Sequence, residues 1–333
     1  MRVAMSTLYS VPPLRVARLL CELRPEAPLH LPLERRSDAL RGTFGAIFRR
    51  AVCDPECPGE DLCPTRQECP YVRLFKPRRD DAEHARDRDP PRPFIFRPPI
   101  ARDPDFGPQR PLRFELRLFG EAIESAEYFL RTFQCFATEG LAGRPARLVS
   151  AWSLDWFGNS RVRLVSDGLW TREQPFILGL EPLFELSPPK GPATFDFVTP
   201  ARVMHHGAGQ TVPTLEAMIL RIAGRISLLS SAYEHRPWTP DMLALQRVAQ
   251  QAVFLDWNGA PVERERNSRS TERKMLMSGF VGSVTYDRIA PELWPLLWIG
   301  QEIHVGRFTE WGHGWFHVLP LERAAKMPPE PHK

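Results

Sequence analysis

The sequence predicts an α+β fold built from two ferredoxin-like units in tandem. Its 333 residues exceed the size of one average domain. Each half of the chain carries elements in the order strand, helix, strand, strand, helix, strand, which is the order of a ferredoxin-like unit. The 35 prolines are about twice the ordinary share of roughly 5%, which favours many extended connections over long helices.

The first unit is expected to span residues 1–185. Apolar residues alternate from Leu14 to Leu23, which predicts a strand. A helix from Ser37 to Val52 places Leu40, Phe44 and Phe48 on one face, with Ser37 or Asp38 as its N-cap. The remaining elements are strands at Phe94–Phe96, Leu112–Phe119 and Arg147–Trp156 and a helix at Ala122–Ala137. Two insertions interrupt this unit, a cysteine-rich stretch over 53–69 and a charged loop over 78–92.

The second unit is expected to span residues 190–320 and to repeat the same order. It opens with a strand over Thr194–Met204 and a helix over Pro213–Ser231. The remaining elements are an extended region from Phe254–Trp257, a strand at Gly279–Tyr286, a short helix at Glu292–Ile299 and a strand at Trp315–Leu319. Residues 321–333 form a loosely ordered tail.

Composition indicates a cytoplasmic protein without a membrane partner. No apolar run reaches about 18 residues, and Met1–Ser10 lacks the layout of a secretory signal. The net charge of +4 is modest, but nearly all of the basic residues are arginines. Arginine pairs with phosphates and stacks on bases, although a genome rich in G and C would explain the same bias.

A glycine-rich segment near the C-terminus carries the strongest motif. It runs from Gly300 to Phe316 and reads GQEIHVGRFTEWGHGWF. Glycines allow backbone N–H groups to approach a phosphate chain closely. Arg307 and Thr309 add donors, and the aromatic residues add stacking surfaces for unpaired bases. The segment therefore predicts an RNA-binding loop, with these candidate contacts: Gly306, Arg307, Thr309, Gly312 and Gly314.

This pattern, H-V-G-[KR]-x-T-x-x-G-x-G-x-[FY], resembles the C-terminal signature of CRISPR repeat-processing endoribonucleases of the RAMP superfamily, in a variant with a four-cysteine insertion. Further segments resemble the same family in the expected order: LRGTFGAIF (40–48), CPYVRLF (69–75), FVTP (197–200), LRIAGRISL (220–228) and RSTERKMLMSGFVGSVTY (269–286). The resemblance implies tandem ferredoxin-like domains that bind CRISPR repeat RNA. It also implies cleavage without a metal ion, in which the 2′-hydroxyl attacks the adjacent phosphorus and leaves a 2′,3′-cyclic phosphate.

Two histidines are candidates for acid–base catalysis of that reaction. Members of the family often carry a catalytic histidine on or near the first helix, but the helix predicted over Ser37–Val52 has none. His30 lies just upstream and is one candidate. His304 enters the glycine-rich segment and is the other, with packing of the loop as an equally good explanation.

Basic and histidine-rich stretches outside this segment are weaker candidates for RNA contact. Arg264, Arg266, Arg269, Arg273 and Lys274 form a basic run, for which RNA contact is slightly favoured over a solvated face. The pair His205–His206 precedes a Gly-x-Gly turn and is either an exposed loop or an RNA contact.

Four cysteines in the first insertion predict a structural metal site. Cys53, Cys57, Cys63 and Cys69 have the spacing C-x3-C-x5-C-x5-C. In a cytoplasmic chain such a cluster favours a shared metal over disulfides, and four thiolates suit tetrahedral zinc. An iron–sulfur cluster and metal-free thiols are the alternatives.

Three functions are therefore open. The first is a metal-independent endoribonuclease on CRISPR repeat RNA. The second is a non-catalytic RAMP subunit that holds crRNA beside other CRISPR effector subunits, which the missing helix histidine favours. The third, with least support, is a zinc-stabilised domain that binds protein partners.

Overall fold

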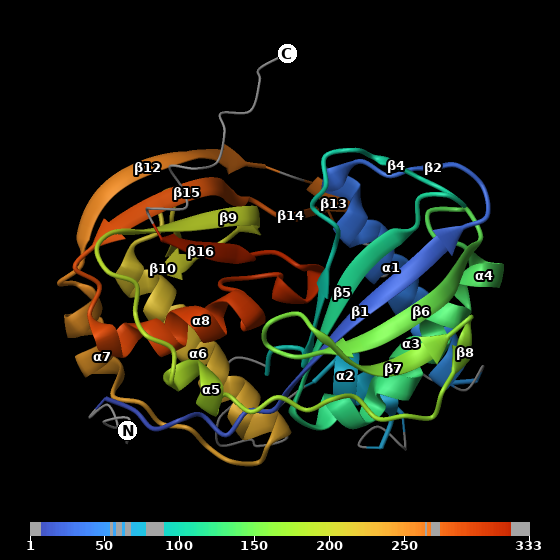
Figure 1. The fold of residues 1–333 in the computed structure, drawn as a ribbon, viewed down its shortest axis with the longest axis horizontal. Coiled ribbons are helices and arrows are strands. Elements are labelled where there is room, and N and C mark those ends of the chain that lie inside the picture. The colour runs from blue at the N-terminus through green and yellow to red at the C-terminus, as the bar shows by residue number, and fades with distance from the viewer. Residues whose placement is uncertain are drawn as a thin grey trace. The chain divides into compact units, whose positions relative to one another are not determined.

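The computed structural model describes residues 8–53, 56–57, 62–63, 68–77, 90–263, 265–267 and 274–320. The chain divides into two compact units (Figure 1). The N-terminal unit comprises Pro13–Gly179 with Leu228–Pro237. The C-terminal unit comprises Met1–Pro12, Leu180–Ser227 and Trp238–Lys333.

The N-terminal unit is built on an antiparallel sheet with the strand order β3-β5-β1-β6-β7-β8. Its strands are β1 (Val16–Pro25), β3 (Phe94–Arg97), β5 (Leu112–Phe119), β6 (Ala146–Leu154), β7 (Ser160–Ser166) and β8 (Leu169–Trp170). A short separate ladder joins β2 (Leu29–His30) to β4 (Asp105–Phe106). The helices are α1 (Leu33–Val52), α2 (Pro70–Phe75), α3 (Ala126–Gln134) and α4 (Phe136–Glu139), with a 3-10 turn, η2 (Gly120–Ser125).

Aromatic residues fill the core between this sheet and its helices. The ring of Phe44 on α1 lies 5.2 Å from that of Phe129 on α3 and 5.0 Å from that of Phe96 on β3. All three side chains are fully buried. Burial of each side chain contributes about 1.5–3 kcal/mol to the stability of the fold. This cluster therefore fixes α1 against the sheet and positions the N-terminal end of the helix.

The C-terminal unit repeats the arrangement with a sheet in the order β12-β15-β9-β16. Its strands are β9 (Ala193–Ala201), β12 (Val253–Val262), β15 (Gly279–Asp287) and β16 (Phe316–Pro320). Two hairpins extend it, β10 (Met204–His205) with β11 (Ala208–Gly209), and β13 (Glu265–Asn267) with β14 (Lys274–Leu276). The helical segments are α5 (Glu181–Phe184), α6 (Leu215–Tyr233), α7 (Met242–Ala249), α8 (Trp294–Ile303) and the 3-10 turns η3 (Pro291–Leu293) and η4 (Thr309–Trp311).

These two sheets confirm the predicted tandem ferredoxin-like fold. In each unit the first strand of the β-α-β-β-α-β series pairs with the third and the fourth, as β1 does with β5 and β6, and β9 with β15 and β16. The predicted element order is therefore found in both units, and the structure adds the strand pairings.

Two predicted helix boundaries were wrong. Helix α1 begins at Leu33, with Pro32 as N-cap and no side-chain cap, so neither Ser37 nor Asp38 caps it. The start of the helix was not predicted because its first turn, which includes Glu34, is charged and shows no apolar periodicity. An acidic residue is nevertheless favourable at a helix N-terminus. The helix predicted over Ala122–Ala137 is divided into η2, α3 and α4. Sequence reasoning also missed α7, which Asp241 caps by accepting a hydrogen bond from the Ala244 N–H at 2.9 Å.

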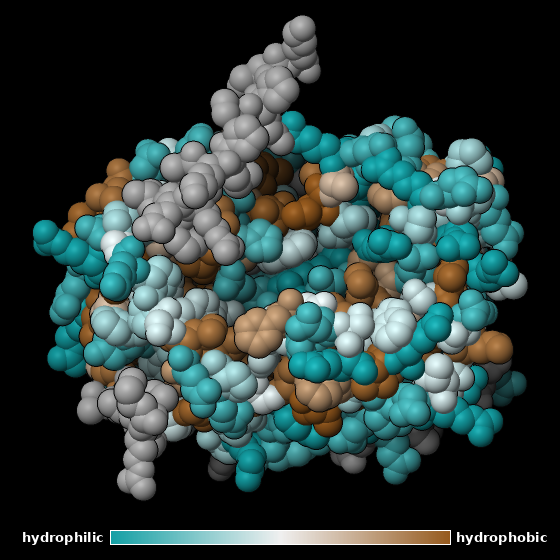
Figure 2. All heavy atoms as spheres, in the orientation of Figure 1, coloured by the Kyte–Doolittle hydropathy of each residue, from teal (hydrophilic) through white to brown (hydrophobic). Residues whose placement is uncertain are grey.

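In the part of the chain that the structure describes, no helix is both long and apolar enough to cross a membrane. On the face drawn in Figure 2, hydrophobic side chains are interspersed with hydrophilic ones. The predicted charged loop lies outside the described residues over 78–89, as does the tail over 321–333.

Candidate functional site

The glycine-rich segment of the C-terminal unit folds into a tight turn between α8 and β16. Gly306 and Gly314 have φ angles of +95° and +71°, in the region that favours glycine. A Cβ at Gly306 would lie 2.5 Å from the Arg202 carbonyl oxygen, and one at Gly314 would collide with the Val305 carbonyl. Gly300 lies inside α8, where a Cβ would meet Ile222 of α6 at 2.5 Å. Gly306 and Gly314 are therefore required by backbone packing, whereas the tip of the Ile222 side chain could shift to accept a Cβ at Gly300.

Most backbone N–H groups of this turn are used internally. The Gly314 N–H donates to the Pro200 carbonyl at 2.8 Å, and the Arg307 N–H donates to that of Arg202 at 3.1 Å. Those of Val305, Trp311, Gly312 and His313 also donate to backbone carbonyls. These N–H groups cannot serve a phosphate, so the turn acts as a rigid support for side chains.

Arg307 is the outward-facing residue of the turn. In the segment from His304 to Trp315, all of which the structure describes, it alone is exposed. Thr309 is 2% exposed, and Gly312 accepts a hydrogen bond from the Thr199 hydroxyl at 2.8 Å through its carbonyl. Of the contacts predicted here, the structure places the Arg307 guanidinium at the surface and the Thr309 hydroxyl inside.

His304 is fully buried at the C-terminal end of α8. Its Nδ1 lies 3.0 Å from the His313 carbonyl oxygen, and because that oxygen can only accept, Nδ1 carries the proton. The ring is stacked on Trp315, with centroids 6.1 Å apart. Its backbone angles, φ +61° and ψ +166°, lie in a region that is nearly restricted to glycine. His304 thus shapes the turn from inside, and its ring has no open path to a ligand at the surface.

His30 has the opposite environment, in the N-terminal unit. It lies on β2 directly opposite Asp105 on β4, and its side chain is 65% exposed. The Nδ1 atom is 2.8 Å from the Asp105 carboxylate. Because an ionised carboxylate can only accept, Nδ1 is the donor and Nε2 keeps a free lone pair. This is the arrangement of an oriented general base.

Arg36 holds together the two segments that carry His30 and Asp105. It lies in the first turn of α1 and is fully buried. Its guanidinium donates to the carbonyls of Leu31 at 3.0 Å and Asp103 at 2.8 Å, and also to those of Pro99 and Ala101. Burial lowers the pKa of Arg36, and the nearby Arg110 lowers it further. This clamp fixes the β2–β4 ladder against the start of α1.

Neither Asp105 nor Arg36 was identified from the sequence. Asp105 is 75 positions from His30, and only the β2–β4 ladder brings them together. Arg36 lies in a charged stretch that indicates a solvated turn. The one usable signal was the position of His30 between the first strand and the first helix.

The predicted basic run falls partly outside the described residues. Arg266 and Lys274 lie on the paired strands β13 and β14. Arg264, Arg269 and Arg273 lie outside the residues that the structure describes.

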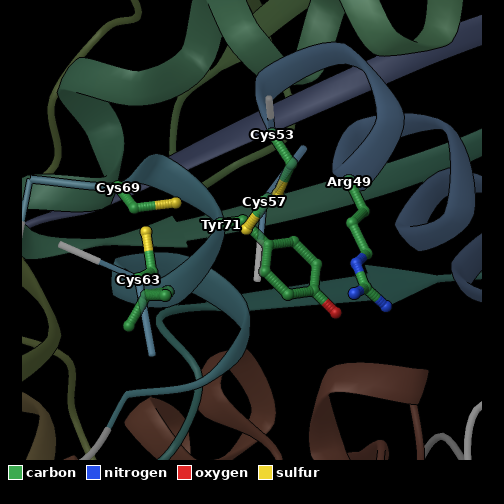
Figure 3. Close-up of a pocket in the computed structure, with 7 residues that line it drawn as sticks. Arg49, Cys53, Cys57, Cys63, Cys69 and Tyr71 are labelled. Carbon is green, nitrogen blue, oxygen red and sulfur yellow. The ribbon is translucent and has the colours of Figure 1, made fainter. Parts of the chain in front are cut away.

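The four cysteines line one pocket beside the end of α1 and the start of α2 (Figure 3). The sulfurs of Cys63 and Cys69 face each other, while Cys53 and Cys57 are near enough to hydrogen-bond. None of the chain's six cysteines forms a disulfide. Burial raises the pKa of Cys53, and the neighbouring Cys69 and Cys57 raise it further. Four thiols lining one pocket are a donor set for a tetrahedral thiophilic ion. Of the remaining cysteines, Cys21 is fully buried and Cys135 packs against the same core.

Family models match parts of both units. Residues 195–316 match the model of CRISPR-associated endoribonuclease Cas6, a range that runs from β9 into β16 and includes the glycine-rich turn. Residues 14–174 match a model described as an N-terminal domain. No curated protein matches the chain.

Solved structures share the fold over nearly the whole length. Thermus thermophilus Cas6 has a TM-score of 0.52 at 17% identity, covering 92% of this chain and 99% of that one. A Cas6 product complex has a TM-score of 0.52 at 20% identity, covering 91% of this chain and 100% of that one. A partial Cas6-RT-Cas1–Cas2 complex has a TM-score of 0.58 at 12% identity, covering 93% of this chain but 47% of the other. The Cas6 family model thus matches the C-terminal unit, and the solved Cas6 structures share the fold of nearly the whole chain.

Proposed function

We propose that this protein binds CRISPR repeat RNA and cuts it into guide RNAs by a reaction that needs no metal ion. The observation that carries the choice of catalytic residue is the exposed His30 imidazole, whose Nδ1 is held by Asp105 at 2.8 Å. A histidine with one nitrogen fixed and the other open to solvent is suited to take a proton from a bound substrate.

The proposed chemistry is an intramolecular transesterification. His30 Nε2 takes the proton from the 2′-hydroxyl, and O2′ attacks the adjacent phosphorus. The bond from phosphorus to the 5′-oxygen breaks, and that oxygen takes up a proton from solvent water. The products are a 2′,3′-cyclic phosphate and a free 5′-hydroxyl. Asp105 holds the reactive tautomer and stabilises the imidazolium that forms.

RNA binding is assigned first to the glycine-rich turn. Arg307 is exposed on a backbone that internal hydrogen bonds hold in place, so the backbone loses little entropy when the guanidinium pairs with a phosphate. The basic run that includes Arg266 and Lys274 is a second contact. His304 supports the turn from inside, since a fully buried ring cannot reach RNA.

The cysteine cluster holds a structural zinc ion in this proposal. Cys53, Cys57, Cys63 and Cys69 would occupy all four positions of a tetrahedral site, so no position remains for a substrate. Because their insertion offers few apolar residues, metal binding would supply much of its folding energy. Elemental analysis should find one equivalent of zinc less in a reduced Cys63→Ser/Cys69→Ser variant than in reduced wild-type protein. Iron with sulfide in place of zinc would point to an iron–sulfur cluster.

The remaining candidate is a non-catalytic subunit that holds crRNA beside other effector subunits. The absence of a histidine from α1 favours it, whereas the exposed pair of His30 and Asp105 favours the nuclease. Either role would place the protein in the cytoplasm, where CRISPR transcripts are made.

The deciding experiment incubates the purified full chain with its end-labelled repeat RNA in excess EDTA. A single cut that leaves a 2′,3′-cyclic phosphate, and that a 2′-deoxy substitution at the cut position abolishes, is the expected result. Circular dichroism before and after EDTA checks that the protein stays folded. Tight binding without cutting would replace the nuclease with the crRNA-holding subunit.

A further inference from the structure

The β10–β11 hairpin of the C-terminal unit brings two histidines next to a glutamate of α6. Its turn consists of His206 and Gly207, with φ angles of +46° and +82°. Such a turn needs positive φ at both central positions, and histidine adopts this conformation less readily than glycine or asparagine. The hairpin follows β9 and precedes α6, so His205 and His206 lie close to Glu216 in the first turn of that helix.

The three side chains converge at the distances of metal ligands. Their donor atoms, one from each of His205, His206 and Glu216, all lie within 4.8 Å of one another. His205 Nε2 is 3.5 Å from Glu216 Oε1. Donor atoms around a tetrahedral zinc ion are about 3.3–3.5 Å apart, given metal–ligand bonds near 2.0–2.2 Å. The pair formed by His205 and Glu216 therefore already has the right separation, and His206, whose side chain is exposed, can adjust to join it.

Glu216 is held in place by a residue that does not belong to the trio. Gln246 on α7 donates from Nε2 to Glu216 Oε1 at 2.6 Å. The side chains of His205 and Glu216 are only 15% and 14% exposed. Outer hydrogen bonds of this kind orient the ligands of metal sites, and a largely buried, fixed carboxylate loses little entropy when a cation binds.

We propose that His205, His206 and Glu216 bind a divalent transition-metal ion of the zinc, cobalt and nickel class. Two imidazoles and one carboxylate suit such ions, and a tetrahedral ion would keep its fourth position for water. Bound there, the ion cross-links the hairpin to α6.

The donor set favours a cation over RNA at this place. The carboxylate of Glu216 would repel a phosphate, whereas it adds to the attraction for a divalent ion. The site is chemically distinct from the cysteine cluster, because it has nitrogen and oxygen donors and no sulfur. The proposal is independent of RNA cleavage, which needs no metal in the mechanism above.

Cobalt titration of the metal-free, reduced full chain tests this. Cobalt bound by thiolates gives an intense ligand-to-metal charge-transfer band, while an ion on histidine and carboxylate gives only weak visible bands. Wild-type protein should take up one ion with the charge-transfer band and a second without it. His206→Asn, which suits the same turn, and Glu216→Gln should each lose the second ion and keep the first.

Gln246→Leu sharpens the test because it retains all three ligands. Loss of this hydrogen bond to Glu216 should lower the affinity for the second ion about 10–100-fold and leave the affinity for the thiolate-bound ion unchanged. Uptake of only the thiolate-bound ion by wild-type protein would overturn the proposal, as would unchanged uptake in both His206→Asn and Glu216→Gln. Weaker repeat-RNA binding by His206→Asn with unchanged cobalt uptake would likewise overturn it, in favour of an RNA contact.

Discussion

His304 and His30 lie in opposite environments, although both were candidates for the same role. His304 belongs to the family motif, is fully buried and donates a hydrogen bond to a backbone carbonyl. His30 lies outside any motif, is 65% exposed and is oriented by a carboxylate. A residue can belong to a motif because the backbone conformation requires it, and not only because it contacts a substrate. The comparison therefore separates a residue that maintains the turn from one that is able to reach RNA.

The largest effect is expected at His30. His30→Ala should slow cutting about 10²–10⁴-fold, because a general base contributes that much, while RNA affinity changes little. Single-turnover cleavage and a binding titration measure the two quantities separately.

His235 provides the matched control for that variant. It is 72% exposed in the N-terminal unit and is also paired with a carboxylate, that of Glu121. His235→Ala should therefore cut at the wild-type rate. If His30→Ala cuts at the wild-type rate, His30 is not the general base. If both variants lose the same amount of cleavage rate, the loss in His30→Ala is not specific to His30.

The next largest effect concerns the backbone of the turn. Gly314→Ala should destabilise the protein by about 2–4 kcal/mol, because the new Cβ collides with the Val305 carbonyl at a φ of +71°. Gly224→Ala, in α6 of the same unit, should instead stabilise it by about 0.5–1 kcal/mol, since nothing lies within 4 Å of its added Cβ. Urea denaturation measures both, and equal effects in the two variants would contradict the packing argument.

The sequence predicted those features that depend on residues close together in the chain, and missed those that depend on contacts between distant segments. The strand and helix order of both units followed from periodicity. The four cysteines were identified as one cluster because they are close in sequence. The carboxylate of Asp105 was not found, because the ladder that brings it to His30 joins segments 75 positions apart. The burial of His304 was also beyond local reasoning, since it depends on how the turn packs on β9 and β16.

A smaller effect on stability distinguishes the contribution of the His304 ring from the strain in the His304 backbone. Both His304→Ala and His304→Gly lose the stack on Trp315 and the hydrogen bond to His313. Only glycine relieves the backbone at φ +61° and ψ +166°. The glycine variant should therefore be about 1–3 kcal/mol more stable than the alanine variant. Denaturation of the two proteins side by side gives this difference, and a more stable alanine variant would show that the backbone is not strained.

The smallest effect is expected at Arg307, and it concerns RNA affinity. If this exposed guanidinium neutralises one phosphate, Arg307→Ala should weaken repeat-RNA binding several-fold and reduce the slope of log affinity against log salt concentration by about 0.7, the value for one contact to a single strand. Arg247→Ala, an exposed arginine on α7, should leave affinity and slope unchanged. The slope is the decisive quantity, because a variant that merely distorted the turn would lose affinity at every salt concentration alike. If the slope for Arg307→Ala equals the wild-type slope, the RNA contact would be assigned to the basic run of β13 and β14 instead.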